Sequence, residues 1–447
     1  MQQPQAQPAN GVNLTEQTAD FVAAHRTEDV RQLALKAKRV EGLDLPLALD
    51  QIAGWQIACK KLPQWASCEG IIYPPHISME QCSSQFTAQY KSEIAQTLLT
   101  PAVTVRARMS DSAESDTQET KTGVRVTDSP ESDTLVERSS MVDLTGGFGV
   151  DFSYLARGFS QATYVERQRH LCDLAEHNMA ALGLDQARIV CDDGVEYLRQ
   201  MDPVDFIYLD PARRDEHGSR TYAIEDCTPN VLELRDLLLA KSQCTLVKLS
   251  PMLDWRKAVA DFDGTVREVH IVATGNECKE LLLVLSQQVH EEPSAPRVFC
   301  VNDNQRIDYD SAAYTQGLRI GGKPLPEAKN YLYEPNASIM KAGCFDLVEE
   351  RFGVTQVGPS SHLFVSATPV ADFPGRGFAI EAIGGMNKKD IKRLLNGTKQ
   401  ANIAVRNFPL TAPQLRKKLK LADGGPVYLF GTTMQGCDHV LLRTSKI

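Results

Sequence analysis

The chain has 447 residues, of which 42% are hydrophobic and 23% are charged. This length predicts several domains, because a single domain usually holds about 100–200 residues. No apolar run approaches the roughly 18–20 residues of a membrane span, and the Gln- and Pro-rich start lacks the features of a signal peptide. The eleven cysteines form no C-x-x-C pair, so we expect a reducing, cytoplasmic setting and no structural metal.

The charge is unevenly distributed. The whole chain carries a net charge of −9, but residues 360–447 hold 13 Lys and Arg against 5 Asp and Glu, a local charge of +8. The remainder therefore carries −17. A basic segment on an acidic enzyme is typical of nucleic-acid binding, although charge alone fits a solvated basic surface equally well.

The first third of the chain is expected to be helical between two irregular segments. Residues 1–12 form a Gln/Pro/Ala tract that we expect to be disordered, and 109–139 form an acidic, Ser/Thr-rich linker or insertion. Between them, residues 13–108 are predicted to form a helical domain. Its apolar spacing predicts helices at 29–37, 47–58 and 83–97.

An alternation of short apolar strands and helical patterns follows over residues 140–292. It predicts an α/β domain with a Rossmann-like, mostly parallel sheet of seven strands. The last two strands are so close together that they suit a hairpin. The strands are expected at 140–144, 162–165, 187–191, 205–209, 244–249, 266–273 and 280–286.

Two small α+β domains are predicted after this sheet, at residues 293–365 and 366–447. The first is expected to contain a strand at 297–301 and a helix at 338–351. For the second we expect strands at 378–383, 401–405, 427–430 and 439–443, with helices at 388–395 and 412–419.

A glycine-rich turn after the first strand is the first candidate site. The strand ends at Asp143 and runs into Thr145-Gly146-Gly147-Phe148-Gly149, where glycines allow the backbone to approach a ligand closely. The G-x-G-x-x-G spacing of a dinucleotide site is broken, and an early acid would repel a pyrophosphate. The acid suits the cationic amino-acid end of S-adenosylmethionine (SAM), whereas the alternative is a tight turn without a ligand.

Acidic residues also end the second and third strands. Glu166 lies 20 positions after Gly146, the register in which an acid accepts hydrogen bonds from ribose hydroxyls. Asp193, or with less support Asp192, is a candidate acceptor for the adenine amino group. The alternative for either aspartate is the N-cap of the helix that follows.

The fourth strand delivers Asp210-Pro211-Ala212-Arg213-Arg214 at its carboxyl end, where open α/β sheets bind ligands. Asp210 can accept from an exocyclic amino group and so orient its nitrogen, while Pro211 stiffens the turn and Arg213 meets phosphate or a base. A salt-bridged loop is the alternative. Lys248-Leu249-Ser250-Pro251 ends the next strand and gives a weaker signal of a pocket wall.

These four motifs, in this order, resemble class I SAM-dependent methyltransferases. The glycine loop is similar to that of RNA guanine-N2 methyltransferases, and Asp210-Pro211 to the Asp-Pro-Pro-Tyr motif of amino-group methyltransferases, from which Ala212 and Arg213 depart. The whole chain resembles a bacterial family with a helical N-terminal region, a ferredoxin-like domain at 293–365 and a THUMP-like domain at 366–447. Residues 399–409 and 415–420 carry the THUMP likeness, although THUMP domains usually precede the catalytic domain.

The resemblance implies that SAM is the cofactor and that Asp143, Thr145, Gly146, Gly147, Phe148, Gly149, Glu166, Asp192, Asp193 and Asp210 bind it. It also implies a methyltransferase acting on a nitrogen of an rRNA or tRNA base, with an exocyclic amine such as guanine N2 favoured and Asp210, Pro211 and Arg213 catalytic. Phosphate-binding charge is expected from Lys388, Lys389, Lys392, Arg393, Arg406, Arg416, Lys417, Lys418 and Lys420, with Phe408 as a stacking partner. The alternatives are a methyltransferase of proteins or small molecules, and a SAM- or RNA-binding protein without catalysis.

Overall fold

The computed structural model describes residues 14–36, 40–99, 139–212, 224–287, 295–314, 329–436 and 438–447. The expected tail at 1–12, and all of the expected linker at 109–139 except Ser139, lie outside these residues. The chain forms two compact units. The first contains Met1–Leu249, Ala258–Val266 and Leu283–Val289, and the second contains Ser250–Lys257, Arg267–Leu282 and His290–Ile447.

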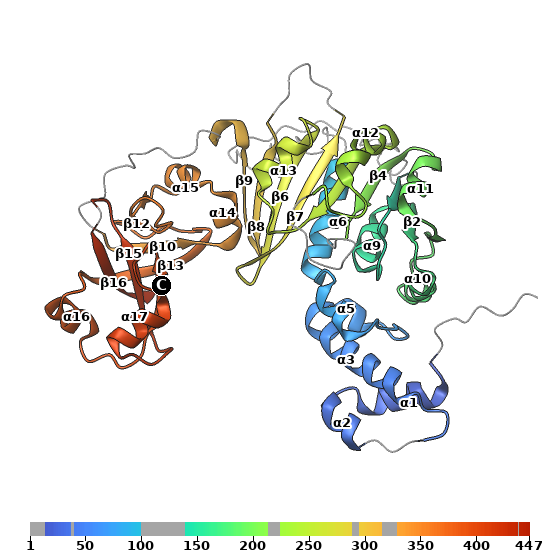
Figure 1. Cartoon of the computed structure of the whole chain (residues 1–447), viewed down its shortest axis with the longest axis horizontal. Coiled ribbons are helices and arrows are strands. Elements are labelled where there is room, and N and C mark those ends of the chain that lie inside the picture. Colours follow the sequence, from blue (N-terminus) through green and yellow to red (C-terminus); the bar gives the residue numbers. More distant parts are fainter. Residues whose placement is uncertain are drawn as a thin grey trace, which may run out of the picture. The chain divides into compact units, whose positions relative to one another are not determined.

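The N-terminal region is helical, as predicted, and contains more helices than expected (Figure 1). The three expected helices are confirmed as α2, α3 and α6. The additional helices are α1, α4 and α5; α1 has ten residues, whereas α4 and α5 have only five and six, which is too short for apolar periodicity to reveal. The helices are α1 (Glu16–His25), α2 (Val30–Lys36), α3 (Leu45–Lys61), α4 (Pro63–Ser67), α5 (His76–Gln81) and α6 (Gln85–Leu99).

Buried hydrogen bonds attach this region to the α/β part of the first unit. The indole Nε1 of Trp65 donates to Ser153 Oγ at 3.1 Å, and both side chains are buried. The amide of Asn178 bonds the backbone of Ile72 in both directions, each at 2.9 Å. Because buried polar groups need such partners, these bonds fix where the helices lie on the sheet domain.

The large sheet has the strand order β3-β2-β1-β4-β5-β7-β6-β8-β9. The first five strands in this order pair in parallel, and the seven expected strands are all present. A two-residue turn at Gly275 and Asn276, both with positive φ, joins β6 and β7 as the expected hairpin. The strands are β1 (Ser140–Asp143), β2 (Gln161–Glu166), β3 (Ala187–Cys191), β4 (Val204–Leu209), β5 (Ser242–Leu249), β6 (Val266–Thr274), β7 (Glu277–Ser286), β8 (Arg297–Asn302) and β9 (Gln305–Asp310).

Two strands extend this sheet beyond the seven that the sequence predicts. The strand expected at 297–301 was assigned to the following α+β domain, but as β8 it pairs in parallel with β6 and antiparallel with β9. The physical reason is that a short apolar strand shows that it is buried without showing which sheet provides its partners.

Helices pack against the strands of the α/β part. Helix α10 packs on β2 and β3 through a buried apolar face that includes Leu171, Leu174 and Met179. The helices are α9 (Val150–Leu155), α10 (Arg169–Ala181), α11 (Gly194–Gln200), α12 (Val231–Lys241) and α13 (Trp255–Asp261), with 3-10 turns η1 (Ala156–Gly158) and η2 (Ser311–Tyr314).

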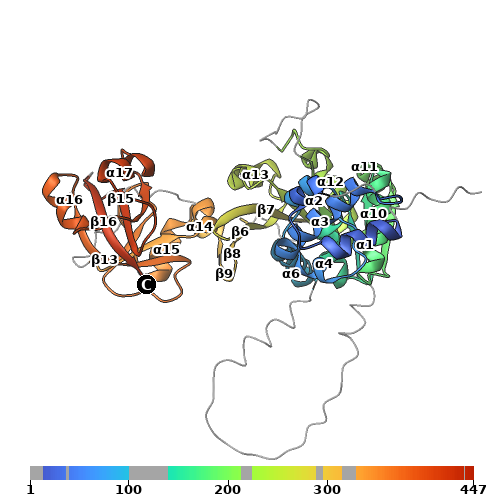
Figure 2. The same ribbon diagram turned by 90° about the horizontal axis from the view of Figure 1, so that it is seen from below.

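A second sheet, in the order β11-β12-β10-β13-β16-β15-β14, forms the C-terminal part. The expected helices at 388–395 and 412–419 are confirmed as α16 and α17, which lie beside this sheet (Figure 2). The helix expected at 338–351 is divided at Gly343, which has a φ of 68°. The elements are β10 (Tyr331–Pro335), α14 (Ala337–Ala342), α15 (Phe345–Phe352), β11 (Thr355–Gln356), β12 (Phe364–Ser366), β13 (Gly375–Gly384), α16 (Lys388–Leu395), β14 (Asn402–Arg406), α17 (Ala412–Leu419), β15 (Val427–Thr433) and β16 (His439–Lys446).

Candidate active site

Charged side chains stand at the carboxyl ends of neighbouring parallel strands. Asp143 ends β1, Glu166 ends β2, Asp210 follows β4 and Lys248 lies at the end of β5. Because these strands are parallel, their carboxyl ends meet at one edge of the sheet, which is where α/β folds bind ligands. The structure therefore brings together three acids that the sequence singled out, with a lysine beside them.

Asp143 is a buried carboxyl group at the start of the glycine loop. Its Oδ1 accepts a hydrogen bond from the backbone N–H of Thr145 at 2.9 Å. Burial raises the pKa of Asp143 to about 8; the bond from Thr145 opposes this, and the nearby charges of Asp151 and Asp210 add to it. Thr145 Oγ1 in turn accepts from the backbone N–H of Asp210 at 2.6 Å, so Thr145 links the ends of β1 and β4.

The glycine loop lies against β2. A Cβ built on Gly146 would come within 2.2 Å of the ring of Tyr164, so only glycine fits there. Gly149, with a φ of 73°, stands at the N-terminus of α9. Glu166 Oε2 accepts from the backbone N–H of Gly147 at 3.1 Å, and the hydroxyl of Tyr164 donates to the Gly147 carbonyl. The loop is therefore held in place against β2, and it has no side chains at its glycines.

The two aspartates after β3 have different surroundings. Asp193 is the N-cap of α11, because its Oδ1 accepts from the backbone N–H groups of Val195 and Glu196 at 2.9 and 3.2 Å. Asp192 is also exposed, and its Oδ1 accepts only a local bond from the Asp193 N–H at 2.8 Å among the hydrogen bonds that the structure describes. The capping alternative for this pair thus applies to Asp193.

Asp210 is held by a lysine. Its Oδ2 lies 2.7 Å from the Nζ of Lys248, and 35% of its side chain is exposed. Pro211 is buried beside it, while Arg213 lies outside the described residues. Lys248 lies in a motif that the sequence gave only weak weight, since a strand-to-loop exit explained it equally well. The pairing itself could not be read from two positions 38 residues apart.

Asp151 and Lys91 also belong to this group, and neither was predicted from the sequence. Asp151, in the first turn of α9, accepts a hydrogen bond from Tyr208 at 2.7 Å and lies within reach of both Lys248 and Lys91. Burial by itself would raise the pKa of Asp151, but the charges of Lys91 and Lys248, together with hydrogen bonds from Tyr208 and Ser83, lower it. Asp151 is therefore an anion at neutral pH.

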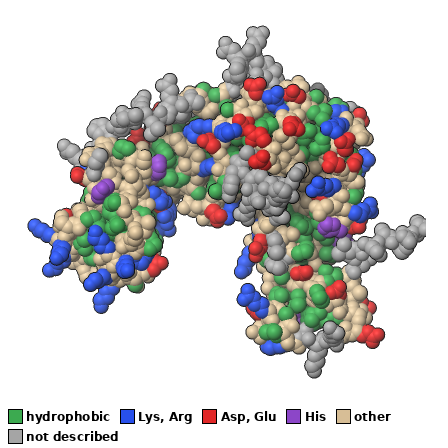
Figure 3. All heavy atoms as spheres, viewed as in Figure 1, with side chains coloured by type: hydrophobic (Ala, Val, Ile, Leu, Met, Phe, Trp, Pro, Cys, Tyr) green, Lys and Arg blue, Asp and Glu red, His purple; other side chains and the backbone are tan. Residues whose placement is uncertain are grey.

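The basic residues expected to bind RNA fall into two groups. Six lysines are exposed on α16, on α17 or just after it, and Figure 3 shows Lys and Arg side chains gathered over these helices. The arginines have protein partners: Arg406 pairs with the buried Glu334 at 2.8 Å, Arg393 with Asp390 at 3.2 Å, and Arg416 with Asp423 at 2.5 Å. The exposed lysines are Lys388, Lys389, Lys392, Lys417, Lys418 and Lys420.

Phe408 was expected to stack on a base. It is half-buried against the core of the C-terminal sheet, with a ring atom 3.1 Å from the position a Cβ on Gly431 would take. Packing therefore already occupies part of this ring.

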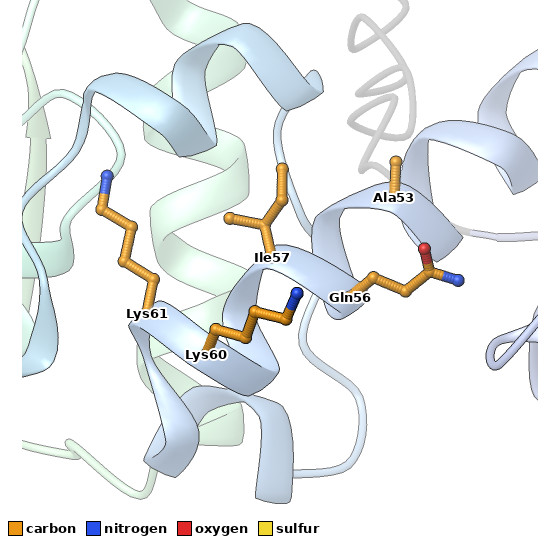
Figure 4. Close-up of a pocket in the computed structure, with 5 residues that line it drawn as sticks. All are labelled: Ala53, Gln56, Ile57, Lys60 and Lys61. Atoms are coloured by element: carbon orange, nitrogen blue, oxygen red, sulfur yellow. The ribbon is translucent and has the colours of Figure 1, made fainter. Parts of the chain in front are cut away.

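A hollow of about 410 Å³ lies in the N-terminal region (Figure 4). Ala53, Gln56, Ile57, Lys60 and Lys61 line it, all from α3, and none belongs to the site at the strand ends. Within the described part of the chain, no helix is long and apolar enough to cross a bilayer. The same residues contain no cluster of three or more metal-ligating side chains.

Known proteins match both the C-terminal part and the whole chain. A family described as a ferredoxin-like domain matches residues 331–374, and one described as THUMP domain-like matches residues 375–446. A crystal structure of a candidate methyltransferase from Porphyromonas gingivalis W83 is 30% identical, covers 96% of this chain and 97% of its own, and has a TM-score of 0.76. The chain belongs to this methyltransferase family.

More distant structures match part of the methyltransferase. A SAM-dependent methyltransferase from Agrobacterium tumefaciens is 18% identical over 34% of this chain and 56% of its own, with a TM-score of 0.26. An rRNA methylase from Streptococcus thermophilus is 15% identical over 34% of this chain and 89% of its own, also with a TM-score of 0.26. Such scores are too low to support an inference about substrate. No curated protein matches the chain.

The residues at this edge of the sheet are compatible with SAM, the cofactor that the sequence predicts. The ring of Tyr164 occupies the place of a Cβ at Gly146, so this glycine lets the loop pack closely against β2, beside the acids that end β1 and β2. Glu166 at the end of β2 and the exposed Asp192 after β3 add carboxylate oxygens at neighbouring strand ends, which suit the hydroxyl and amino donors of a nucleoside rather than a pyrophosphate. The expectations of a class I methyltransferase fold and of a ferredoxin-like and a THUMP-like domain are thus confirmed.

Proposed function

We propose that this enzyme methylates a nitrogen of a base in rRNA or tRNA, an exocyclic amino group such as guanine N2 being favoured. Bound SAM supplies an electrophilic methyl group. The observation that carries the proposal is the state of Asp210: Lys248 fixes its Oδ2 at 2.7 Å, and the described residues give Oδ1 no hydrogen bond. A carboxylate with one fixed oxygen can accept a hydrogen bond from an amino group and so direct the lone pair of the nitrogen.

The cofactor-binding roles are part of this proposal. Asp143 faces the cationic amino-acid end of SAM, Glu166 accepts from the ribose hydroxyls, and Asp192 accepts from the adenine amino group. The cap that Asp193 provides to α11 favours Asp192 for the adenine. Glu166 bonds the N–H of Gly147 and that of Gln168, so its carboxylate is already oriented by the loop it serves.

The C-terminal part supports RNA as the substrate class. Residues 375–446 match a THUMP-like family, and the lysines exposed on and beside α16 and α17 provide a surface that suits phosphates. Arg406 and Arg416 are partly engaged by Glu334 and Asp423, so we assign the phosphate contacts chiefly to the lysines.

The test uses the purified full chain, methyl-labelled SAM and unmodified total RNA, with Asp210→Ala as the control variant. Label in RNA that is lost in the variant, while SAM binding measured by calorimetry persists, supports the proposal. Nucleoside analysis of the labelled RNA then identifies the base and the atom. Label that enters only protein or a small molecule would replace RNA with that acceptor.

A further inference from the structure

Lys91 of α6 is completely buried, although lysine is among the residues that are least often found inside proteins. Its Nζ lies 3.1 Å from Asp151 Oδ1, and Asp151 Oδ2 lies 3.5 Å from the Nζ of Lys248. Lys248 reaches Asp210 at 2.7 Å. Four side chains of alternating sign therefore connect the N-terminal helical region to the strand end where we place the reacting amine.

Hydroxyl groups bind this row of charges together. Ser83 Oγ, which precedes α6, donates to Asp151 Oδ2 at 2.9 Å and accepts from the Nζ of Lys91 and that of Lys248, both at 3.2 Å. Tyr208 on β4 donates to the same carboxylate oxygen at 2.7 Å. Asp151 and Lys248 are each only 11% exposed, so water screens these contacts weakly.

We propose that Lys91 is a positioning residue for methyl transfer: it holds Asp151, and Asp151 and Ser83 hold Lys248 in the place where it fixes the Asp210 carboxylate. The proposal rests on the role assigned to Asp210 above. It gives the N-terminal helical region a purpose, since this region would supply a charge without which the catalytic edge is incomplete.

Electrostatics explain why the effect would reach Asp210. With both lysines in place, the four groups are electrically balanced. Without Lys91, Lys248 becomes the main cation that pairs with Asp151 among the described residues, and one lysine is then shared by two carboxylates. Lys248 is drawn toward Asp151, and its contact with Asp210 lengthens.

A purely structural role for Lys91, in which it only helps α6 to pack, explains the arrangement less well. Apolar side chains on the same helix, Ala88, Ile94 and Ala95, are already buried. Apolar residues at both position 91 and position 151 would extend this face without burying two charges, and such a replacement of a buried ion pair is often neutral or stabilising. The charge is therefore better accounted for by what it does to Asp151 and Lys248.

The experiment measures kcat and KM for SAM and RNA in Lys91→Met and Lys91→Arg. The matched control is Gln51→Met, which removes a buried polar side chain that bonds the backbone of Tyr73 in the same helical region, away from the charged row. We expect kcat to fall about 100-fold in Lys91→Met, with both KM values within about threefold, and Lys91→Arg to recover most of the loss. Gln51→Met should lower the melting temperature and keep kcat.

A double-mutant cycle shows whether Lys91 acts through Lys248. In a Lys248→Met background, adding Lys91→Met should have almost no further effect on kcat, because the residue through which it acts is gone. Independent, additive losses would overturn the proposal, and so would a folded Lys91→Met enzyme with the kcat of the unmodified chain. If Lys91→Met does not fold, the same cycle with Lys91→Gln, which removes the charge and keeps a polar side chain, gives the answer.

A crystal structure of Lys91→Met tests the inference without any methyl acceptor. We expect the distance from Lys248 Nζ to Asp210 Oδ2 to exceed 4 Å, and an unchanged 2.7 Å contact would overturn the inference. If the unmodified enzyme does not methylate RNA but this distance responds, the proposed substrate fails while the role of Lys91 in positioning stands.

Discussion

Lys248 and Asp210 stand at the ends of the neighbouring strands β5 and β4, with Nζ and Oδ2 2.7 Å apart. This contact connects a buried row of charges to a side chain that is 35% exposed, the carboxylate that we propose contacts the substrate. Asp210 is thus one member of an ion pair, and its partner Lys248 can be replaced while Asp210 is kept.

Lys248→Met is expected to lower kcat about 100-fold, because Asp210 loses the contact that fixes one of its oxygens. SAM affinity should change little, since Glu166 and the glycine loop remain in place. Steady-state kinetics and calorimetric titration with SAM provide the two measurements. A variant that keeps kcat but no longer binds SAM would show that Lys248 serves the cofactor instead.

Gly146→Ala is expected to weaken SAM binding by at least tenfold and to lower the free energy of unfolding by about 1–3 kcal/mol. The added Cβ would lie 2.2 Å from the ring of Tyr164, so the loop or the ring must move. Gly183→Ala is the matched comparison, because a Cβ there meets nothing within 4 Å. Its positive φ of 69° predicts a loss of about 1 kcal/mol with SAM binding unchanged. Equal losses of SAM affinity in both variants would contradict the prediction.

Much of the site follows from sequence because its chemistry is local. Asp143, Glu166 and Asp210 each follow an apolar strand, so pattern alone places them at one sheet edge. The first and last residues of α16 and α17 could be predicted, because Asn387 and Thr411 cap these helices and polar turns follow them.

The residues that hold Asp210 in place could not be predicted, because their contacts are not local in sequence. Lys91 sits within an ordinary amphipathic helix, and its partner Asp151 is 60 positions later, so no spacing rule connects them. The same holds for β8, whose apolar residues indicate burial but not the sheet that they join. Pairings that depend on tertiary contacts leave no local periodicity to read.

The raised pKa of Asp143 predicts how the free energy of unfolding depends on pH. Its pKa of about 8 in the folded chain exceeds the ordinary 3.8, so between these values the folded state holds a proton that the unfolded chain has released. Its contribution to the free energy of unfolding therefore falls as pH rises through this window. Denaturant titrations of the native chain and of Asp143→Asn, at a series of pH values, should show a shallower decline in the variant. Parallel curves would contradict the assignment.

The same carboxyl group predicts how SAM binding depends on pH. A cationic ligand end favours the ionised form of Asp143, so binding should release a proton near neutral pH, and the Kd for SAM should fall as pH rises toward 8. Calorimetry in buffers of different ionisation enthalpy measures the released proton. In Asp143→Asn both the release and the pH dependence should disappear, while an unchanged release would place the titrating group elsewhere.

The exposed lysines of α16 predict a salt dependence for RNA binding. Replacing Lys388, Lys389 and Lys392 with Gln removes three charges that the structure leaves exposed. Each phosphate contact contributes about 0.7–0.9 to the slope of log K against log salt, so the slope should decrease by about 2 to 3 if all three lysines meet phosphates. Fluorescence anisotropy with a labelled structured RNA, between low and physiological salt, measures this slope.

The comparison for this triple variant is Arg31, Lys36 and Lys60 changed to Gln, which removes the same charge from exposed positions on the N-terminal helices. That variant should keep the slope of the unmodified chain, because a general loss of positive charge is not a loss of phosphate contacts. If the two triple variants lower the slope equally, RNA affinity follows net charge and the α16 surface has no special part in it. If only the α16 variant changes the slope while kcat at saturating RNA persists, the lysines hold the substrate and the strand-end site performs the transfer.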